Sequence, residues 1–260
     1  MDVVIGIAEI FGVKMPENFR QPFFSKSISE FWTRWHITLG AWFRDYIYYP
    51  VSLADKCKKI TSAARKKLGN YYGPMISSAI ALFCVWICNG IWHGTGWNFI
   101  FFGIYHFVLI LAGRLIEPVA GKINKKIHIN SKHFLYRLIQ MIRTTILVFI
   151  GELFFRANTL KDGFQMFSQM ISKISFNFIN DGTILELGID RQDFIIVGIM
   201  TLVIFVISIL KERGVDLRES ISKKNIAIRW ALYYAVVLSI IVFGAYGAGY
   251  IPVNPMYAQY

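Results

Sequence analysis

Hydrophobic residues gather in five long runs that polar segments separate. The runs cover residues 75–92, 97–113, 138–155, 194–210 and 230–247. Each approaches the roughly 20 residues that a helix needs to cross a bilayer. The runs lack the alternation of barrel strands, and helices satisfy their own backbone hydrogen bonds in lipid. The pattern therefore predicts an all-α, polytopic helical membrane protein with about five transmembrane spans, built as a single membrane domain over residues 1–260.

Basic residues follow the predicted spans at regular intervals. Segments 51–74, 114–137 and 211–229 each carry six Lys or Arg, whereas segment 156–193 carries four against five acidic residues. By the positive-inside rule, the three basic segments are cytoplasmic loops of a multi-pass protein in the cell membrane. The net charge of +12 is thus assigned to loop ends beside lipid head groups. No aromatic and basic RNA-binding pattern accompanies it, so the expected partner is the lipid bilayer and not nucleic acid.

Segment 27–50 is long enough for a sixth span but is too polar for one. Arg34, Arg44 and Asp45 would each cost about 2.5 to 3.5 kcal/mol at a lipid-exposed helix centre. The segment is therefore predicted to be an interfacial or re-entrant helix that carries an Arg-Trp-His sequence. Its first residues, Ser-Ile-Ser-Glu, are typical of a capping box at a helix start.

The strongest candidate for chemistry lies between the first two runs, within residues 75–113. Residues 89–98 have the sequence Asn-Gly-Ile-Trp-His-Gly-Thr-Gly-Trp-Asn. An ionisable side chain at membrane depth is costly, so His93 is a functional-site candidate. Trp92 and Trp97 can wall a pocket, and the glycines allow the backbone to bend or a substrate to come close.

Two further histidines lie in apolar surroundings. His36 follows a tryptophan in segment 27–50, where a hydrogen-bonded structural role is the commoner alternative. His106 either lines the same cavity as His93 or is a buried structural residue. A metal or haem site would have to use these three histidines alone, because no cysteine or carboxylate stands at ligand spacing. No metal site is predicted.

Several short stretches also carry a likeness to a known family. They are Ser-Ile-Ser-Glu-Phe-Trp at 27–32, Arg-Trp-His-Ile-Thr-Leu at 34–39, Trp-Phe-Arg-Asp-Tyr-Ile-Tyr-Tyr-Pro at 42–50, Asn-Gly-Ile-Trp-His-Gly at 89–94, Trp-Asn-Phe at 97–99, Gly-Ile-Tyr-His at 103–106 and Phe-Gly-Ala-Tyr-Gly at 243–247. In these stretches the chain resembles the membrane-bound O-acyltransferase (MBOAT) family, in its alginate O-acetyltransferase-like branch. The helices that precede the Arg-Trp-His helix in the family pattern are absent, so the chain is expected to be a C-terminal portion of that pattern.

The resemblance implies a catalytic role for His93 and a second functional role for His36. It implies transfer of an acyl group, acetyl as first choice, from a thioester donor to hydroxyls of an exported polysaccharide. The donor would be acetyl-CoA or a carrier-protein-linked thioester, with no bound cofactor. A neutral imidazole suits a general base at pH 7, so His93 is expected to take the hydroxyl proton. The weaker substrate-binding candidates are Asn89, which is expected to stabilise the oxyanion, and Trp92, Trp97, Trp35, Arg44 and His106.

Other functions stay open. Transfer of D-alanine towards teichoic acid is the alternative activity, and an inactive truncated remnant that only binds partners is another. A transporter or proton relay would place similar residues in membrane helices, usually in symmetric halves, and the sequence has no internal repeat. Candidate protein partners are a periplasmic or extracellular acyltransferase and an acyl carrier protein.

Overall fold

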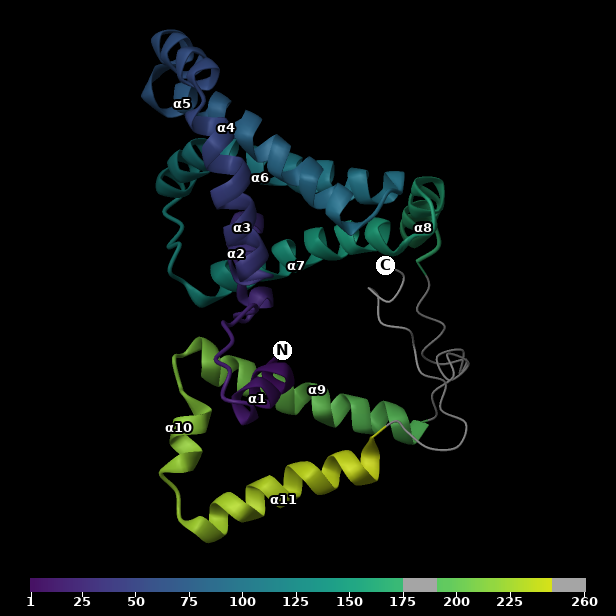
Figure 1. The fold of residues 1–260 in the computed structure, drawn as a ribbon. Coiled ribbons are helices and arrows are strands. Elements are labelled where there is room, and N and C mark those ends of the chain that lie inside the picture. The colour runs from purple at the N-terminus through teal and green to yellow at the C-terminus, as the bar shows by residue number, and fades with distance from the viewer. Residues whose placement is uncertain (175–190, 245–260) are drawn as a thin grey trace. The chain divides into compact units, whose positions relative to one another are not determined.

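The computed structural model describes residues 1–174 and 191–244 of the chain (Figure 1). The regular structure in these two ranges is helical, with one isolated bridge between Phe19 and Trp35. The chain divides into two compact units, Met1–Ser175 and Phe176–Tyr260, which are taken separately below. The helical architecture agrees with the fold that the hydrophobic runs predict.

Five helices in the described ranges are long and apolar enough to cross a membrane. They are α5 (Asp55–His93), α6 (Trp97–Lys126), α7 (Phe134–Arg156), α9 (Arg191–Glu212) and α11 (Ile226–Phe243). The prediction of a helical membrane protein with about five spans is confirmed. The end of the last predicted run, residues 245–247, lies outside the described residues, as does the last part of the family-like stretch there.

Helix α5 is bent at Gly69, whose φ of 76° and ψ of −176° a residue with a Cβ rarely adopts. The parts before and after the bend fold back on each other. Thr61 Oγ1 donates a hydrogen bond to Ser77 Oγ at 2.6 Å, and a Cβ on Gly73 would lie 2.7 Å from the backbone nitrogen of Arg65. The first basic segment, which the sequence predicts to be a loop, is therefore largely helical.

The polar segment 27–50 is not one helix. It forms α2 (Ile28–Arg34), α3 (Ile37–Phe43), the π-helical turn η2 (Arg44–Tyr48) and the beginning of α4 (Tyr49–Leu53). The start is as predicted, because Ser27 Oγ accepts a hydrogen bond from the Glu30 backbone N–H at 3.1 Å. The continuous helix expected over residues 27–50 is instead interrupted at His36, whose φ of 49° and ψ of 53° are left-handed. A residue in that conformation cannot continue a right-handed helix, so the chain turns there.

Helices α5 and α6 approach each other closely at two glycines. A Cβ on Gly90 would lie 2.7 Å from the carbonyl oxygen of Phe99, and a Cβ on Gly103 would collide with the carbonyl oxygen of Trp86. The two backbones can come this close only because both positions lack a side chain. The contact fixes the last turn of α5, which ends at His93, against the first turns of α6.

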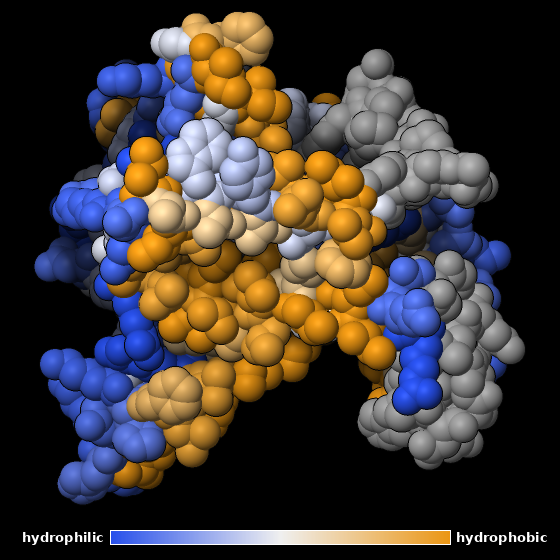
Figure 2. Space-filling view, turned by 90° about the horizontal axis from the view of Figure 1, so that it is seen from below, coloured by the Kyte–Doolittle hydropathy of each residue, from blue (hydrophilic) through white to orange (hydrophobic). Residues whose placement is uncertain are grey.

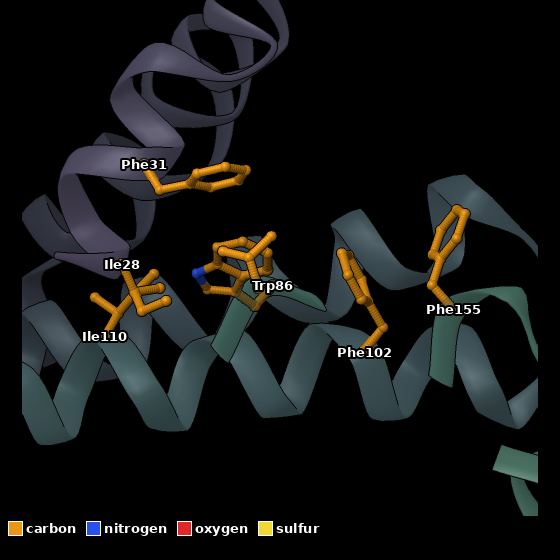
Figure 3. Close-up of a cluster of buried hydrophobic side chains, with 7 residues drawn as sticks. Ile28, Phe31, Trp86, Phe102, Ile110 and Phe155 are labelled. Carbon is orange, nitrogen blue, oxygen red and sulfur yellow. The ribbon is translucent and has the colours of Figure 1, made fainter. Parts of the chain in front are cut away.

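A cluster of buried hydrophobic side chains joins α2 to the long helices. Its members are Ile28, Phe31, Trp86, Phe102, Ile110, Val148 and Phe155. Figure 3 shows them as a row along the helices, with Trp86 between Ile110 and Phe102. Because α2 has only seven residues, burial of its aromatic side chains in this cluster must hold it in place.

Polar contacts link α7 to α6. Tyr105 Oη donates a hydrogen bond to the Leu147 carbonyl at 2.8 Å. Asn98 Nδ2 donates to the carbonyl oxygens of Phe155, at 3.4 Å, and Ala157, at 3.0 Å. The last carbonyls of a helix have no partner within it, so buried Asn98 completes the end of α7.

Shorter helices complete the first unit. They are α1 (Asp2–Ile10), the 3₁₀ turn η1 (Pro22–Phe24) and α8 (Leu160–Ser172). Thr159 Oγ1 caps α8 by accepting a hydrogen bond from the Asp162 N–H at 3.2 Å. Phe154 of α7 packs edge to face on Phe164 of α8, so α8 lies against the end of the span that precedes it.

The second unit contains α9, α10 (Leu217–Ser222) and α11. Most of the large apolar side chains of α9 and α11 are exposed. Broad hydrophobic areas, orange in Figure 2, cover much of the face that the figure shows. Exposed apolar surface of this extent suits contact with lipid better than contact with water.

The close contact between α5 and α6 makes a first prediction. Gly103→Ala places a methyl group against the Trp86 carbonyl, and overpacking of this kind lowers the free energy of unfolding by about 1 to 3 kcal/mol. The matched control is Gly113→Ala on the same helix, where a Cβ meets nothing within 4 Å. Thermal unfolding in detergent should therefore separate the two variants. Equal midpoints would contradict the close approach of the backbones.

Candidate active site

His36 occupies the break between α2 and α3, and Asn18 holds that break. The Ile37 backbone N–H donates to the Asn18 carbonyl at 3.0 Å. The Thr38 N–H and the Thr38 hydroxyl both donate to Asn18 Oδ1, at 2.9 and 2.6 Å. A left-handed conformation costs a non-glycine residue of order 1 kcal/mol or more, so it persists only when its surroundings enforce it. These three hydrogen bonds do so for His36.

The segment before α2 also packs on the ring of His36. The Arg20 N–H donates to the Arg34 carbonyl at 2.9 Å, which pairs this segment with the end of α2. Phe19 lies edge to face on Trp35 with the ring centroids 4.8 Å apart, and its centroid is 5.9 Å from that of His36. The imidazole is thus fixed by backbone pairing and by aromatic contacts.

His93 is the last residue of α5. Gly94 follows it with a φ of 155°, which favours glycine and ends the helix. The ring centroid of His93 is 4.8 Å from that of Phe155 and 6.0 Å from that of Phe102, both edge to face. The imidazole therefore lies in an aromatic setting formed by α6 and α7.

Trp92 connects the two histidines. Its ring centroid is 4.7 Å from that of His93 and 5.9 Å from that of His36, with steep interplanar angles in both pairs. Residues that are 57 positions apart in the sequence therefore meet around one indole ring.

A cavity of about 350 Å³ adjoins this pair on the His36 side. Its wall comes from α2, α3, η2, α4, α5 and α6. The lining includes the predicted site residues His36, Trp35, Asn89 and Arg44, whereas His93, Trp92, Trp97 and His106 are not part of it. Trp97 instead has 76% of its surface exposed at the start of α6. The structure thus divides the predicted residues between the cavity and its surroundings.

Two buried polar atoms at this cavity have no hydrogen-bond partner within the described residues. They are Nδ1 of His36 and Oδ1 of Asn89. An unsatisfied buried polar atom costs about 1 to 3 kcal/mol, which a bound ligand can recover. Both atoms belong to residues that line the cavity.

His106 has a different environment. It is fully buried, and its Nδ1 accepts a hydrogen bond from Trp32 Nε1 at 3.2 Å. Trp86 stacks on its ring with the centroids 5.3 Å apart, and Gly151 of α7 gives it room. Of the two interpretations of His106, the geometry favours the buried structural residue.

His36 and Arg44, two ionisable residues of the cavity wall, have different surroundings. Burial lowers the pKa of His36 below its usual value, which favours the neutral imidazole at pH 7. Arg44 is exposed, and its hydrogen bond to Asp45, at 2.9 Å from Nε to Oδ1, raises the pKa of its guanidinium. In the described part of the chain, no group of three His, Cys, Asp or Glu side chains is arranged to hold a metal ion.

Some residues at the cavity were not predicted from the sequence. Arg114 and Tyr48 line it, and Ser78 hydrogen bonds to both. Arg114 follows the second hydrophobic run, so the charge pattern assigns it to a cytoplasmic loop, whereas it lies within α6. Its position 36 residues from Ser78 could be found only from the packing of α5 on α6.

No protein-family model matches the chain. It is, however, 33% identical over 171 residues to the probable alginate O-acetylase AlgI of Pseudomonas syringae pv. tomato, which is 66% of this chain and 28% of the relative. A relative from Helicobacter pylori named peptidoglycan O-acetyltransferase is 28% identical over 65% of this chain and 28% of its own length.

A third relative belongs to the other expected branch. The chain is 38% identical over 123 residues to the teichoic acid D-alanyltransferase of Bacillus subtilis, which is 47% of this chain and 27% of the relative. Together with the helical membrane fold, these similarities make the chain a relative of the membrane-bound O-acyltransferases. It spans less than a third of the length of each of these relatives.

The role of Asn18 can be tested directly. Asn18→Ala removes the acceptor for Thr38 and frees the turn at His36, so the ring becomes more exposed and its lowered pKa should rise towards about 6.5. Asn18→Asp keeps the acceptor oxygen and serves as the conservative control. Histidine-selective NMR titration in detergent measures the change. An unchanged His36 pKa in Asn18→Ala would show that the hydrogen bonds to the Asn18 side chain do not control the environment of His36.

Proposed function

We propose that the chain acts in a membrane O-acyltransferase that moves an acyl group, acetyl as first choice, from a thioester to hydroxyls of an exported polysaccharide. The observation that carries this proposal is the meeting of His36 and His93 at Trp92 beside a cavity. The names of the relatives support acyl transfer to an envelope polymer.

The reaction needs a base for the acceptor hydroxyl. His93, in its neutral form, takes the hydroxyl proton as the oxygen attacks the thioester carbonyl. The C–O bond forms, the tetrahedral intermediate collapses, and the C–S bond breaks. The proton held on His93 then passes to the departing thiolate, so that ester and free thiol are the products. General base catalysis of this kind contributes about 10² to 10⁴ in rate.

His36 and Asn89 assist from the cavity wall. His36, whose buried Nδ1 has no hydrogen-bond partner within the described residues, orients the acceptor or polarises the donor carbonyl. Asn89 lies one helical turn before His93, and its buried amide has an oxygen without a partner. A half-turn of that amide exchanges its oxygen and nitrogen, so it can accept from the hydroxyl or donate to the developing oxyanion.

The aromatic walls have a chemical purpose in this proposal. A thioester is lost to hydrolysis when water reaches it, and Trp92, Phe102 and Phe155 surround the reacting imidazole with apolar surface. Exclusion of water also strengthens the hydrogen bonds that stabilise charge in the transition state.

The basic segments give the proposed orientation. With segments 51–74, 114–137 and 211–229 in the cytoplasm, the donor is a cytoplasmic thioester, either acetyl-CoA or linked to an acyl carrier protein. The acceptor polysaccharide is reached on the other side of the membrane, where an extracellular or periplasmic acyltransferase is a candidate partner. No bound cofactor is needed for this chemistry.

D-alanyl transfer towards teichoic acid is the second candidate. It is favoured by the 38% identity to the Bacillus subtilis relative, which is higher, over a shorter region, than the identity to the alginate relative. Both activities use the same base and the same thioester chemistry, and they differ in the acyl group and in the acceptor.

Replacement of the histidines in the source cell tests the proposal. His93→Ala should lower polymer acylation by about 100-fold or more because the base is lost, and His36→Ala should also lower it. His128→Ala, at an exposed turn after α6, is the control and should leave it unchanged. Mass spectrometry of the envelope polymers measures acetyl and D-alanyl esters separately. Wild-type acylation in His93→Ala would contradict the proposed mechanism. If deletion of the whole chain left the acetyl and D-alanyl esters unchanged, the protein would be inactive.

The pH dependence follows from His36. Its pKa is lowered, so the neutral ring persists below about pH 6.5 and is lost only as the pH falls through the lowered value. The acid limb of the acyl-transfer rate in membranes should therefore lie below about pH 6.5, and it should move upward in Asn18→Ala. A limb at or above that pH in the wild type would contradict a role for neutral His36.

A further inference from the structure

Arg114 is a positively charged residue in the wall of the cavity. It lies on membrane-spanning α6, is partly buried and lines the cavity. Its Nη1 donates to Ser78 Oγ at 3.0 Å, and no carboxylate of the described residues forms an ion pair with it. A partly buried guanidinium gains from a negatively charged partner beside it. A negatively charged group bound in the cavity could supply that partner.

Other donors surround the same end of the cavity. Ser78 also shares a hydrogen bond with Tyr48 Oη at 2.7 Å, so Arg114, Ser78 and Tyr48 form one connected group. Arg44 of η2 lines the same cavity. Its partner Asp45 offsets one of the two guanidinium charges, which leaves the end of the cavity positive.

The rest of the cavity has another character. Between the basic end and the His36 end, its wall includes Leu82, Val85 and Ile110. Asn89 lies eleven residues beyond Ser78 on α5, which is roughly 16 Å along a helix at about 1.5 Å per residue. The cavity thus runs from a positive end, past apolar walls, to the unpartnered polar atoms of Asn89 and His36.

We propose that Arg114, with Arg44 and Tyr48, binds a phosphate ester at the basic end of the cavity, and that this ester belongs to the thioester donor. Two guanidinium groups and a phenol hydroxyl supply donors suited to phosphate oxygens. This inference rests on the proposed function, and it names the part of the donor that is recognised.

The shape of the cavity favours the donor over a lipid head group as the source of the phosphate. A donor of the pantetheine type has a phosphate ester at one end, an uncharged flexible arm, and the thioester at the other end. Bound by its phosphate at Arg114, it would extend along the apolar wall and bring its carbonyl towards Asn89 and His36. A lipid phosphate would fill the basic end and leave the rest of the cavity to its acyl chains.

Binding without turnover tests the site. The full chain in phosphatidylcholine nanodiscs is titrated with 4′-phosphopantetheine and with pantetheine, which lacks the phosphate. The wild type should bind the phosphorylated compound at least about tenfold more tightly. Arg114→Gln should abolish this preference. Arg114→Lys keeps the positive charge but loses the paired N–H donors of the guanidinium, so it should keep part of the preference. Arg143→Gln, whose guanidinium bonds the Lys26 carbonyl away from the cavity, is the matched control and should retain the preference.

A second experiment tests whether a phospholipid is the ligand of this site. Nanodiscs with added phosphatidylglycerol are analysed by native mass spectrometry. Retention of this lipid by the wild type but not by Arg114→Gln, with no phosphopantetheine preference, would keep the phosphate site and overturn the donor as its ligand. Equal binding of both pantetheines, and equal lipid retention by wild type and Arg114→Gln, would overturn the site altogether. Since no acyl transfer is measured, failure of the proposed activity leaves these outcomes readable.

Discussion

The close approach of α5 and α6 is the constraint on which the rest of the first unit depends. Gly90 and Gly103 let each backbone reach carbonyl groups of the other helix, at a spacing that no side chain would permit. Asn89 and His93 belong to the same end of α5, and Phe102 of α6 packs against the ring of His93. In lipid, where apolar burial gives little driving force between helices, tight packing of this kind is a main source of association.

A second constraint acts on the short helices. Helix α2 is too short to be stable alone, and it is held by the burial of Phe31 and by the hydrogen bond from Trp32 to His106. In that hydrogen bond His106 is the acceptor that ties α2 to α6. The break then turns His36 towards the cavity and towards Trp92, while His93 approaches Trp92 along α5.

The sequence predicts the local features well, because each depends on nearby residues. Length and hydropathy indicate the five spans, and the Ser27–Glu30 pair indicates the start of α2. The left-handed turn at His36 escapes prediction, since no glycine or proline marks it and Asn18, eighteen residues earlier, enforces it. Arg114 escapes for a similar reason. A charge at the end of an apolar run is usual for a loop, and only the packing of α5 shows that it lines a cavity.

The central claim is that His36 and His93, which belong to separate segments, both pack against the indole ring of Trp92. Magic-angle-spinning NMR of the chain in lipid bilayers, with labelled histidine and tryptophan, measures this directly. The account predicts through-space correlations from the imidazoles of both His36 and His93 to the ring of Trp92. Correlations from His93 alone, with His36 showing contacts only to Phe19 and its neighbours, would contradict it.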